Sequence, residues 1–105
     1  MDFSERTVIV TGSASGIGRA TAEAFSEQGA NVVIADIDVD EGEKAAESLP
    51  GEGDAVAIKT DVRDESQVKR MVTTAVDSFG SVDVLINNAG VSQTVEPTVD
   101  QSISE

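Results

Sequence analysis

The hydrophobic positions of this chain fall into short continuous runs, separated by longer segments with helical spacing. Four apolar runs have the length of buried strands, and they occupy residues 7–10, 31–36, 55–61 and 82–86. A helix is predicted over residues 16–28, because apolar residues recur at helical spacing at Ile17, Ala20, Ala24 and Phe25. Gly29 is a suitable end for this helix.

Two further helices are predicted after the second and third runs. The first of them is indicated by small and apolar residues at positions i, i+3, i+4 and i+7, namely Gly42, Ala45, Ala46 and Leu49. It is expected to end at Pro50 and Gly51. The other helix ends at Gly80 and has a six-residue apolar stripe: Val68, Met71, Val72, Ala75, Val76 and Phe79. We expect Asp64 to cap it, with Gln67 in the capping-box position.

The resulting order β-α-β-α-β-α-β predicts an α/β fold of the Rossmann type, a doubly wound parallel sheet with helices on both faces. Residues 1–105 would form one partial domain of four strands and three helices, with the last strand at a sheet edge. Ligands of such sheets bind beyond the carboxyl ends of the strands, where the strand order reverses. The segments at those ends are TGSASGIG, AD, TDV and NNAG, which are poorly suited to a core.

The first of these segments joins a strand to a helix and contains Gly12, Gly16 and Gly18. Its G-x-x-x-G-x-G spacing differs from the G-x-G-x-x-G fingerprint, but free N–H groups at the helix start favour an anion in the same way. We expect Gly12 to permit a tight turn, Gly16 to let the backbone approach a pyrophosphate, and Gly18 to let the helix lie close to the sheet. The hydroxyls of Ser13 and Ser15 can donate to ribose or phosphate. The alternative is an ordinary glycine-rich turn.

Asp36 ends the second strand. A carboxylate at this place can accept hydrogen bonds from both hydroxyls of an adenosine ribose, and it would repel a 2′-phosphate. The next residue is Ile37, and the sequence indicates Arg19 as the only nearby cation. NAD is therefore favoured over NADP. The alternative is that Asp36 is simply one of the 20 acidic residues.

The charge of the chain is strongly acidic: 20 Asp and Glu against 7 Lys and Arg give a net charge of −13. Such a charge disfavours nucleic acid and anionic membranes as partners. Self-repulsion destabilises the compact state unless salt screens it, so we favour a halophilic host over an ordinary acidic protein. No apolar run is long enough to span a membrane and no secretory signal is present at the start, so we expect a cytoplasmic protein. Without His or Cys, we expect no metal site.

These residues together resemble the short-chain dehydrogenase/reductase family. TGSASGIG is similar to its cofactor loop T-G-x-x-x-G-x-G, and NNAG at residues 87–90 looks like its second signature. The pair Asp61 and Val62 resembles the adenine-contacting pair that follows the third strand. The resemblance extends along the whole chain, with the motifs in the same order and at similar spacing.

The resemblance implies a role for each matching position in binding NAD. The backbone that would hold ribose and pyrophosphate lies around Gly12, Ser15, Ile17 and Gly18. Asp36 would bind the adenosine ribose, Asp61 would accept a hydrogen bond from the adenine amine, and the backbone of Val62 would contact the ring. The path toward the nicotinamide ribose would be lined by Asn87, Ala89 and Gly90. The alternative for the asparagines is a simple turn.

The acid–base pair of this family, a Tyr followed four residues later by a Lys, cannot be present because the chain has no tyrosine. We therefore expect the cofactor-binding part of an NAD-dependent oxidoreductase that acts on an alcohol or ketone. The 105 residues should be inactive alone, and the complete enzyme should be a homo-oligomer. A non-catalytic NAD-binding module and an inactive truncated product are the alternatives. A methyltransferase would leave NNAG and TDV unexplained, and sugar-nucleotide epimerases have a different glycine spacing.

Overall fold

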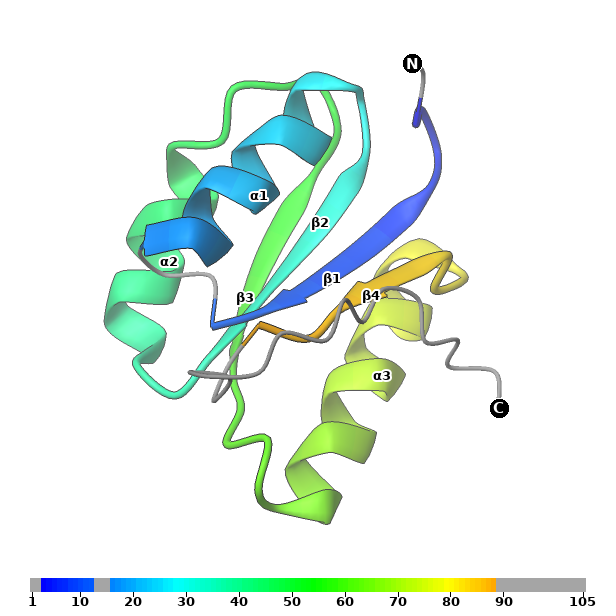
Figure 1. The fold of residues 1–105 in the computed structure, drawn as a ribbon. Coiled ribbons are helices and arrows are strands. Elements are labelled where there is room, and N and C mark those ends of the chain that lie inside the picture. The colour runs from blue at the N-terminus through cyan, green and yellow to red at the C-terminus, as the bar shows by residue number, and fades with distance from the viewer. Residues whose placement is uncertain (1–2, 13–15, 89–105) are drawn as a thin grey trace.

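A computed structural model describes residues 3–12 and 16–88 (Figure 1). Its four strands form one parallel sheet in the order β3-β2-β1-β4. Their bounds are β1 (Thr7–Thr11), β2 (Asn31–Asp36), β3 (Ala55–Lys59) and β4 (Val84–Ile86). The alternating helices are α1 (Gly16–Glu27), α2 (Val39–Glu47) and α3 (Glu65–Phe79). The predicted α/β architecture of the Rossmann type is confirmed, with β4 at an edge of the described sheet.

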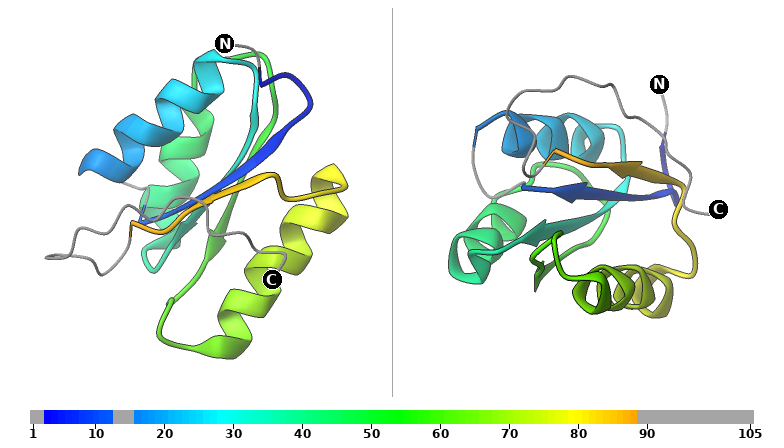
Figure 2. Two further views of the ribbon diagram at one scale, coloured as in Figure 1. Left: turned by 45° about the vertical axis from the view of Figure 1, so that its right-hand side comes forward. Right: turned by 60° about the horizontal axis from the view of Figure 1, so that its bottom comes forward.

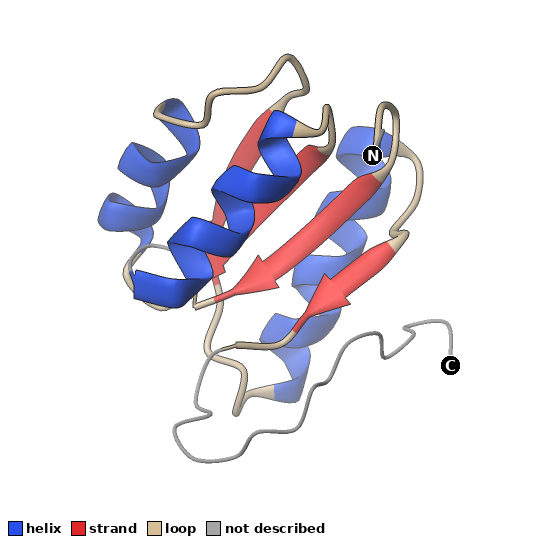
Figure 3. Ribbon diagram, turned by 45° about the horizontal axis from the view of Figure 1, so that its top comes forward, coloured by secondary structure: helices blue, strands red, loops and turns tan. Residues whose placement is uncertain are grey.

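Helices cover both faces of the sheet, with α1 and α2 on one face and α3 on the other (Figures 2 and 3). On the face covered by α1 and α2, the buried core residues are Val8, Val10, Ala22, Ala30, Val32 and Ile34. The core on the α3 face has as its buried residues Ile9, Val33, Ala35, Met71 and Ala75. Successive residues of the central strands β1 and β2 therefore contribute to opposite cores, as expected for parallel strands covered on both sides.

The buried face of α1 consists of small residues: Gly18, Ala22 and Ser26. The helix forms as predicted, but Ile17, Ala20 and Ala24, three of the four apolar residues that indicated it, lie on its exposed side. Small side chains allow the helix backbone to approach the sheet closely. Close approach of this face to the sheet therefore sets the orientation of the helix, and Phe25 also packs against the core.

Three strand boundaries differ from the predicted ones. The first strand ends at Thr11 instead of Val10. The third strand ends at Lys59 instead of Asp61, because Asp61 begins a turn in which its carbonyl accepts a hydrogen bond from the backbone N–H of Asp64 at 2.9 Å. The fourth strand begins at Val84 instead of Val82. Just before it, the Asp83 carboxylate accepts a hydrogen bond from the backbone N–H of Thr7 at 2.8 Å, which ties the start of β4 to the start of β1.

Asp64 caps α3 as predicted, because its Oδ1 accepts a hydrogen bond from the backbone N–H of Ser66 at 3.0 Å. The predicted capping box is wrong. The backbone N–H of Asp64 donates to the carbonyl of Asp61 at 2.9 Å, so it does not donate to the Gln67 side chain. Gln67 instead accepts from the backbone N–H of Asp61 at 2.9 Å and donates to the Asp64 carboxylate at 3.1 Å. Its side chain thus joins the start of α3 to the end of the preceding strand.

The strand order reverses between β1 and β4. The chain adds β2 and then β3 on one side of β1, and it returns through α3 to place β4 on the other side. The carboxyl ends of β1 and β4 are in register, with Val10 opposite Ile86. This reversal is the position at which ligands of doubly wound sheets bind.

Candidate functional site

The carboxyl ends of three adjacent strands are joined by backbone hydrogen bonds. Beyond β1, the N–H of Gly12 donates to the carbonyl of Ala35 at 2.8 Å. Beyond β3, the N–H of Thr60 donates to the carbonyl of Asp36 at 2.9 Å. The glycine turn, Asp36 and the segment that begins at Asp61 therefore lie along one edge of the sheet, as predicted from the order of strands.

The glycine turn leaves β1 in a conformation that favours glycine. Gly12 has φ +64° and Gly16 has φ +65°, in the left-handed region where residues with a side chain are strained. A methyl group placed on Gly16 would meet no described atom within 4 Å, so the outer side of the turn is open there. Gly16 is followed by Ile17, which is 77% exposed at the start of α1. The predicted positions Ser13 and Ser15 lie outside the described residues.

Gly18 is in direct contact with the turn that precedes it. A methyl group at this position would overlap the carbonyl oxygen of Gly12 and lie 2.8 Å from the side-chain nitrogen of Asn88. The first turn of α1 therefore packs directly on the end of β1, and no residue other than glycine fits without movement of the backbone.

Thr11 is a site residue that the sequence-based interpretation missed. It is 2% exposed at the end of β1, and its Oγ1 accepts a hydrogen bond from the backbone N–H of Asn88 at 2.8 Å. The same oxygen donates toward Oδ1 of Asn87 at 3.0 Å. A second contact joins Nδ2 of Asn88 to the carbonyl of Gly12 at 3.4 Å. The available signal was a hydroxyl residue directly after the apolar residues Val8, Ile9 and Val10.

These contacts give the two asparagines a defined structural role. They attach the segment after β4 to the glycine turn after β1, across the point where the strand order reverses. A simple turn after β4 would need no such long-range partners. Ala89 and Gly90, the other predicted positions of this segment, lie outside the described residues.

Asp36 is half-buried at the end of β2 and begins a tight turn into α2. Its Oδ1 accepts a hydrogen bond from the backbone N–H of Asp38 at 2.9 Å. Asp38 in turn caps α2 by accepting from the backbone N–H of Glu41 at 3.1 Å. The intervening Ile37 is 55% exposed, so an apolar surface lies directly beside the Asp36 carboxylate.

The expectation that Arg19 is the only cation near Asp36 is wrong. Lys59 is the register partner of Asp36 on the adjacent strand, and paired residues of parallel strands project from the same face. The side chain of Arg19 donates to Oγ of Ser48 at 2.9 Å and lies 3.5 Å from the Glu23 carboxylate. The sequence could not indicate Lys59, because the pairing of β2 with β3 joins residues that are 23 positions apart.

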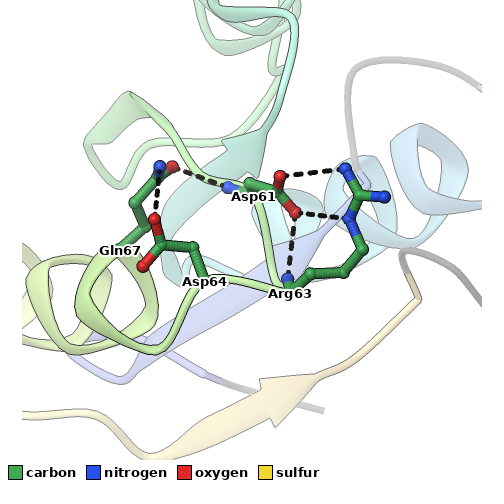
Figure 4. A network of polar contacts seen from close by, with 4 residues as sticks. All are labelled: Asp61, Arg63, Asp64 and Gln67. Atoms are coloured by element: carbon green, nitrogen blue, oxygen red, sulfur yellow. Dashed lines mark hydrogen bonds and ion pairs between the residues drawn. The ribbon is translucent and has the colours of Figure 1, made fainter.

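Beyond β3, Asp61 and Arg63 form a compact polar network with Asp64 and Gln67 (Figure 4). The Arg63 side chain donates from Nε to Oδ1 of Asp61 at 3.0 Å and from Nη2 to Oδ2 at 3.1 Å. These hydrogen bonds lower the pKa of the Asp61 carboxyl and raise the pKa of the Arg63 guanidinium. Val62, between them, is half-buried. The carboxylate expected to bind adenine is thus held by a neighbouring guanidinium.

Among residues 3–12 and 16–88, no group of three or more acidic, His or Cys side chains is placed to hold a metal ion. None of the helices in that part of the chain is both long and apolar enough to cross a bilayer.

Comparison with known families identifies the chain. The family model described as short chain dehydrogenase matches residues 6–105. The chain belongs to this family. The motifs TGSASGIG and NNAG and the parallel sheet that joins them are therefore those of a short-chain dehydrogenase, as the resemblance in the sequence implied.

Several characterised short-chain dehydrogenases are similar to this chain. The chain is 48% identical over 92 residues to L-rhamnose 1-dehydrogenase (NAD(P)(+)) from Azotobacter vinelandii, covering 83% of the chain and 36% of that protein. It is 43% identical over 91 residues to meso-2,3-butanediol dehydrogenase from Serratia marcescens, covering 87% of the chain and 36% of that protein. The crystal structure of a hydroxysteroid dehydrogenase from Escherichia coli matches with a TM-score of 0.80 and 32% identity, over 85% of this chain and 38% of that one. The chain thus spans little more than a third of the length of these relatives.

Proposed function

We propose that this chain forms the dinucleotide-binding part of an NAD-dependent short-chain dehydrogenase/reductase. The observation that carries the proposal is the glycine turn, which is open on its outer side at Gly16 and is joined to β2 directly before Asp36. Positive φ at Gly12 and Gly16, followed by a helix N-terminus, suits a pyrophosphate, because the first N–H groups of a helix have no partners within that helix. A carboxylate beside it suits the hydroxyls of a ribose.

The remaining site residues would bind the ends of the dinucleotide. Asp61 and the backbone of Val62 would bind the adenine, and Asn87 would lie on the path to the nicotinamide ribose together with Ala89 and Gly90. Ser13, Ser15 and the backbone of Ile17 would complete the phosphate site. When bound, NAD supplies the acceptor for a hydride. The residues of this chain would bind and orient it.

NAD remains the favoured cofactor in this proposal. Asp36 would repel a 2′-phosphate at close range, and the following Ile37 provides no charge to compensate. Lys59 acts in the opposite direction, because this cationic residue is the register partner of Asp36 on the adjacent strand. The name of the relative from Azotobacter vinelandii includes both NAD and NADP. The balance between Asp36 and Lys59 would therefore decide how strongly NAD is preferred.

For the complete enzyme we propose hydride transfer between NAD and a small alcohol or ketone. The support is that similar proteins are named for such substrates, including meso-2,3-butanediol and cis-4-hydroxycyclohexanecarboxylate. We also propose that the complete enzyme is a cytoplasmic homo-oligomer of a halophilic host. Residues 1–105 contain no tyrosine to serve as the acid–base residue, so they are expected to bind NAD without oxidising alcohols.

Isothermal titration calorimetry of NAD binding to the 105-residue chain tests this proposal. Binding should be saturable and should weaken in Asp36→Ala. The control is Asp40→Ala, which removes an exposed acidic residue from the first turn of α2 and should bind NAD like the unchanged chain. Absence of binding to NAD and NADP would refute the proposal. Steady formation of NADH by the 105 residues with secondary alcohols would refute the expected inactivity.

A further inference from the structure

Three hydrogen-bond donors of Arg63 converge on one carboxylate. The backbone N–H and the Nε of Arg63 donate to Oδ1 of Asp61 at 2.9 and 3.0 Å, and Nη2 donates to Oδ2 at 3.1 Å (Figure 4). An ionised carboxylate has about four acceptor positions, two on each oxygen. Arg63 uses two positions on Oδ1 and one on Oδ2, which leaves one acceptor position on Oδ2.

This pair contributes little to the stability of the fold. The Arg63 side chain is 81% exposed and the Asp61 side chain is 26% exposed, and ion pairs in such positions have small effects on stability. The backbone at Asp61 is held separately, by the hydrogen bond from its N–H to the side chain of Gln67. The two-point contact of the guanidinium therefore mainly fixes the direction in which the Asp61 carboxylate points.

We propose that Arg63 is a positioning residue for adenine recognition, which orients Asp61 so that its remaining acceptor position on Oδ2 receives the 6-amino group of the base. This inference rests on the proposed function, in which Asp61 binds adenine. A carboxylate that is ionised and fixed in this way accepts hydrogen bonds and cannot donate them. It therefore favours a purine with an amino group at position 6 and disfavours one with a carbonyl oxygen there.

The planar guanidinium is needed for this role. Its fork of N–H groups contacts both carboxylate oxygens at once, whereas the ammonium of a lysine is a point charge that holds no plane. The backbone N–H of residue 63 remains in every variant, so Oδ1 keeps one partner. Loss of the side chain should let the carboxylate rotate, and the distinction between the two kinds of purine should weaken.

The test compares NAD with nicotinamide hypoxanthine dinucleotide, in which a carbonyl oxygen replaces the 6-amino group. The unchanged chain should bind NAD more tightly than the hypoxanthine dinucleotide by about 10-fold or more, because one hydrogen bond to a charged group contributes a difference of this size. In Arg63→Ala this ratio should fall by about 5-fold, within the range of one such bond. Arg63→Lys should behave like Arg63→Ala. Arg70→Ala removes the same charge from an exposed position of α3 and should leave the ratio unchanged.

The ratio separates positioning from general effects. A loss of long-range attraction for the pyrophosphate, or a slight loosening of the fold, would weaken both dinucleotides equally and leave the ratio unchanged. An unchanged ratio in Arg63→Ala therefore overturns this inference and leaves the proposed function standing. Tighter binding of NAD by Arg63→Ala also overturns it, since Arg63 would then compete with adenine. If the unchanged chain binds neither dinucleotide, the proposed function fails and this inference fails with it.

Discussion

The Oγ1 atom of Thr11 accepts a hydrogen bond from the backbone N–H of Asn88 at 2.8 Å, across 77 positions of the sequence. Thr11 ends β1 and Asn88 follows β4, so this bond joins the two segments on either side of the strand reversal. The same oxygen lies 3.0 Å from Oδ1 of Asn87. One buried hydroxyl thus holds the glycine turn and the segment after β4 in a fixed relative position.

Replacement of Thr11 by Val should destabilise the chain while preserving the size of the side chain. The N–H of Asn88 would lose its partner in a half-buried position, and we expect the free energy of unfolding to fall by about 1–3 kcal/mol. Urea denaturation followed by circular dichroism measures this change. Thr73→Val, at an exposed position of α3, is the matched control and should have little effect. Equal stability of the two variants would contradict the role of Thr11.

Gly18→Ala should disrupt the contact between α1 and the end of β1. The added methyl group would overlap the Gly12 carbonyl, so the helix must move, and we expect a loss of about 2 kcal/mol or more together with weaker NAD binding. Gly42→Ala is the control within α2, where the methyl group would have ordinary contacts of 3.5 and 3.6 Å. It should be neutral or stabilising by up to about 1 kcal/mol. The prediction fails if the two alanine variants melt at the same temperature.

The double variant Asp36→Ala, Ile37→Arg should shift cofactor preference toward NADP. It removes the carboxylate that would repel a 2′-phosphate and adds a guanidinium that can bind one. Dissociation constants for NAD and NADP should show the ratio moving toward NADP by about 10-fold or more, as expected for one charged hydrogen bond. Adding Lys59→Ala to this variant should reverse part of the shift. A preference for NAD that does not change would remove Asp36 from the ribose site.

The carboxylate of Asp64 should make α3 sensitive to acid. Hydrogen bonds from the Ser66 side chain and backbone lower the pKa of Asp64 in the folded chain below its ordinary 3.8. Stability from this group is therefore present above its ordinary pKa and is lost as the pH falls through the lower pKa of the folded state. Asp64→Asn keeps a good helix cap but does not titrate.

Melting temperatures measured across the acid range test whether the stability contributed by Asp64 is lost as the pH falls. The unchanged chain should melt above Asp64→Asn near neutral pH, and the difference should shrink as the pH falls below 3.8. General relief of the negative charge affects both proteins to nearly the same extent, because Asp64→Asn changes the net charge only from −13 to about −12. A difference that stays constant with pH, or grows in acid, would contradict the assigned cause.

Salt should stabilise the chain. A net charge of −13 on 105 residues causes self-repulsion that ions screen, so the melting temperature should rise as KCl is added to dilute buffer. At low salt we expect partial unfolding or association, which the position of β4 at an edge of the described sheet favours. Sedimentation and calorimetry at several KCl concentrations measure both effects. A monomer that melts cooperatively in dilute buffer, at a temperature that salt does not change, would contradict this prediction.

Local patterns were sufficient to predict the order of the elements. The apolar run that forms β2 and the apolar stripe along α3 are each continuous in the sequence, so strand and helix could be assigned from spacing alone. Asp64 was predictable as a cap for the same reason, because its partner Ser66 is two residues away. These features depend on nearest neighbours along the chain.

Features that depend on tertiary contacts could not be predicted in the same way. The buried face of α1 is set by the approach of Gly18 to Gly12, so the apolar residues of that helix indicated its existence but not its orientation. The sequence fits the capping-box pattern whether the Gln67 side chain accepts from the backbone N–H of Asp64 or from that of Asp61. The turn before α3 decides that it accepts from Asp61. Lys59 becomes a neighbour of Asp36 only through strand pairing.

The place of β1 in the middle of the sheet has a consequence for how the chain folds in time. Thr7 pairs with Asn31 of β2, 24 positions away, but Val8 pairs with Val84 of β4, 76 positions away. Closing the longer loop costs about 1 kcal/mol more in chain entropy, so β4 should dock after the other strands have assembled. During synthesis, one side of β1 therefore stays without a neighbour until most of these residues have been made. A second nascent chain could pair with that side before β4 does.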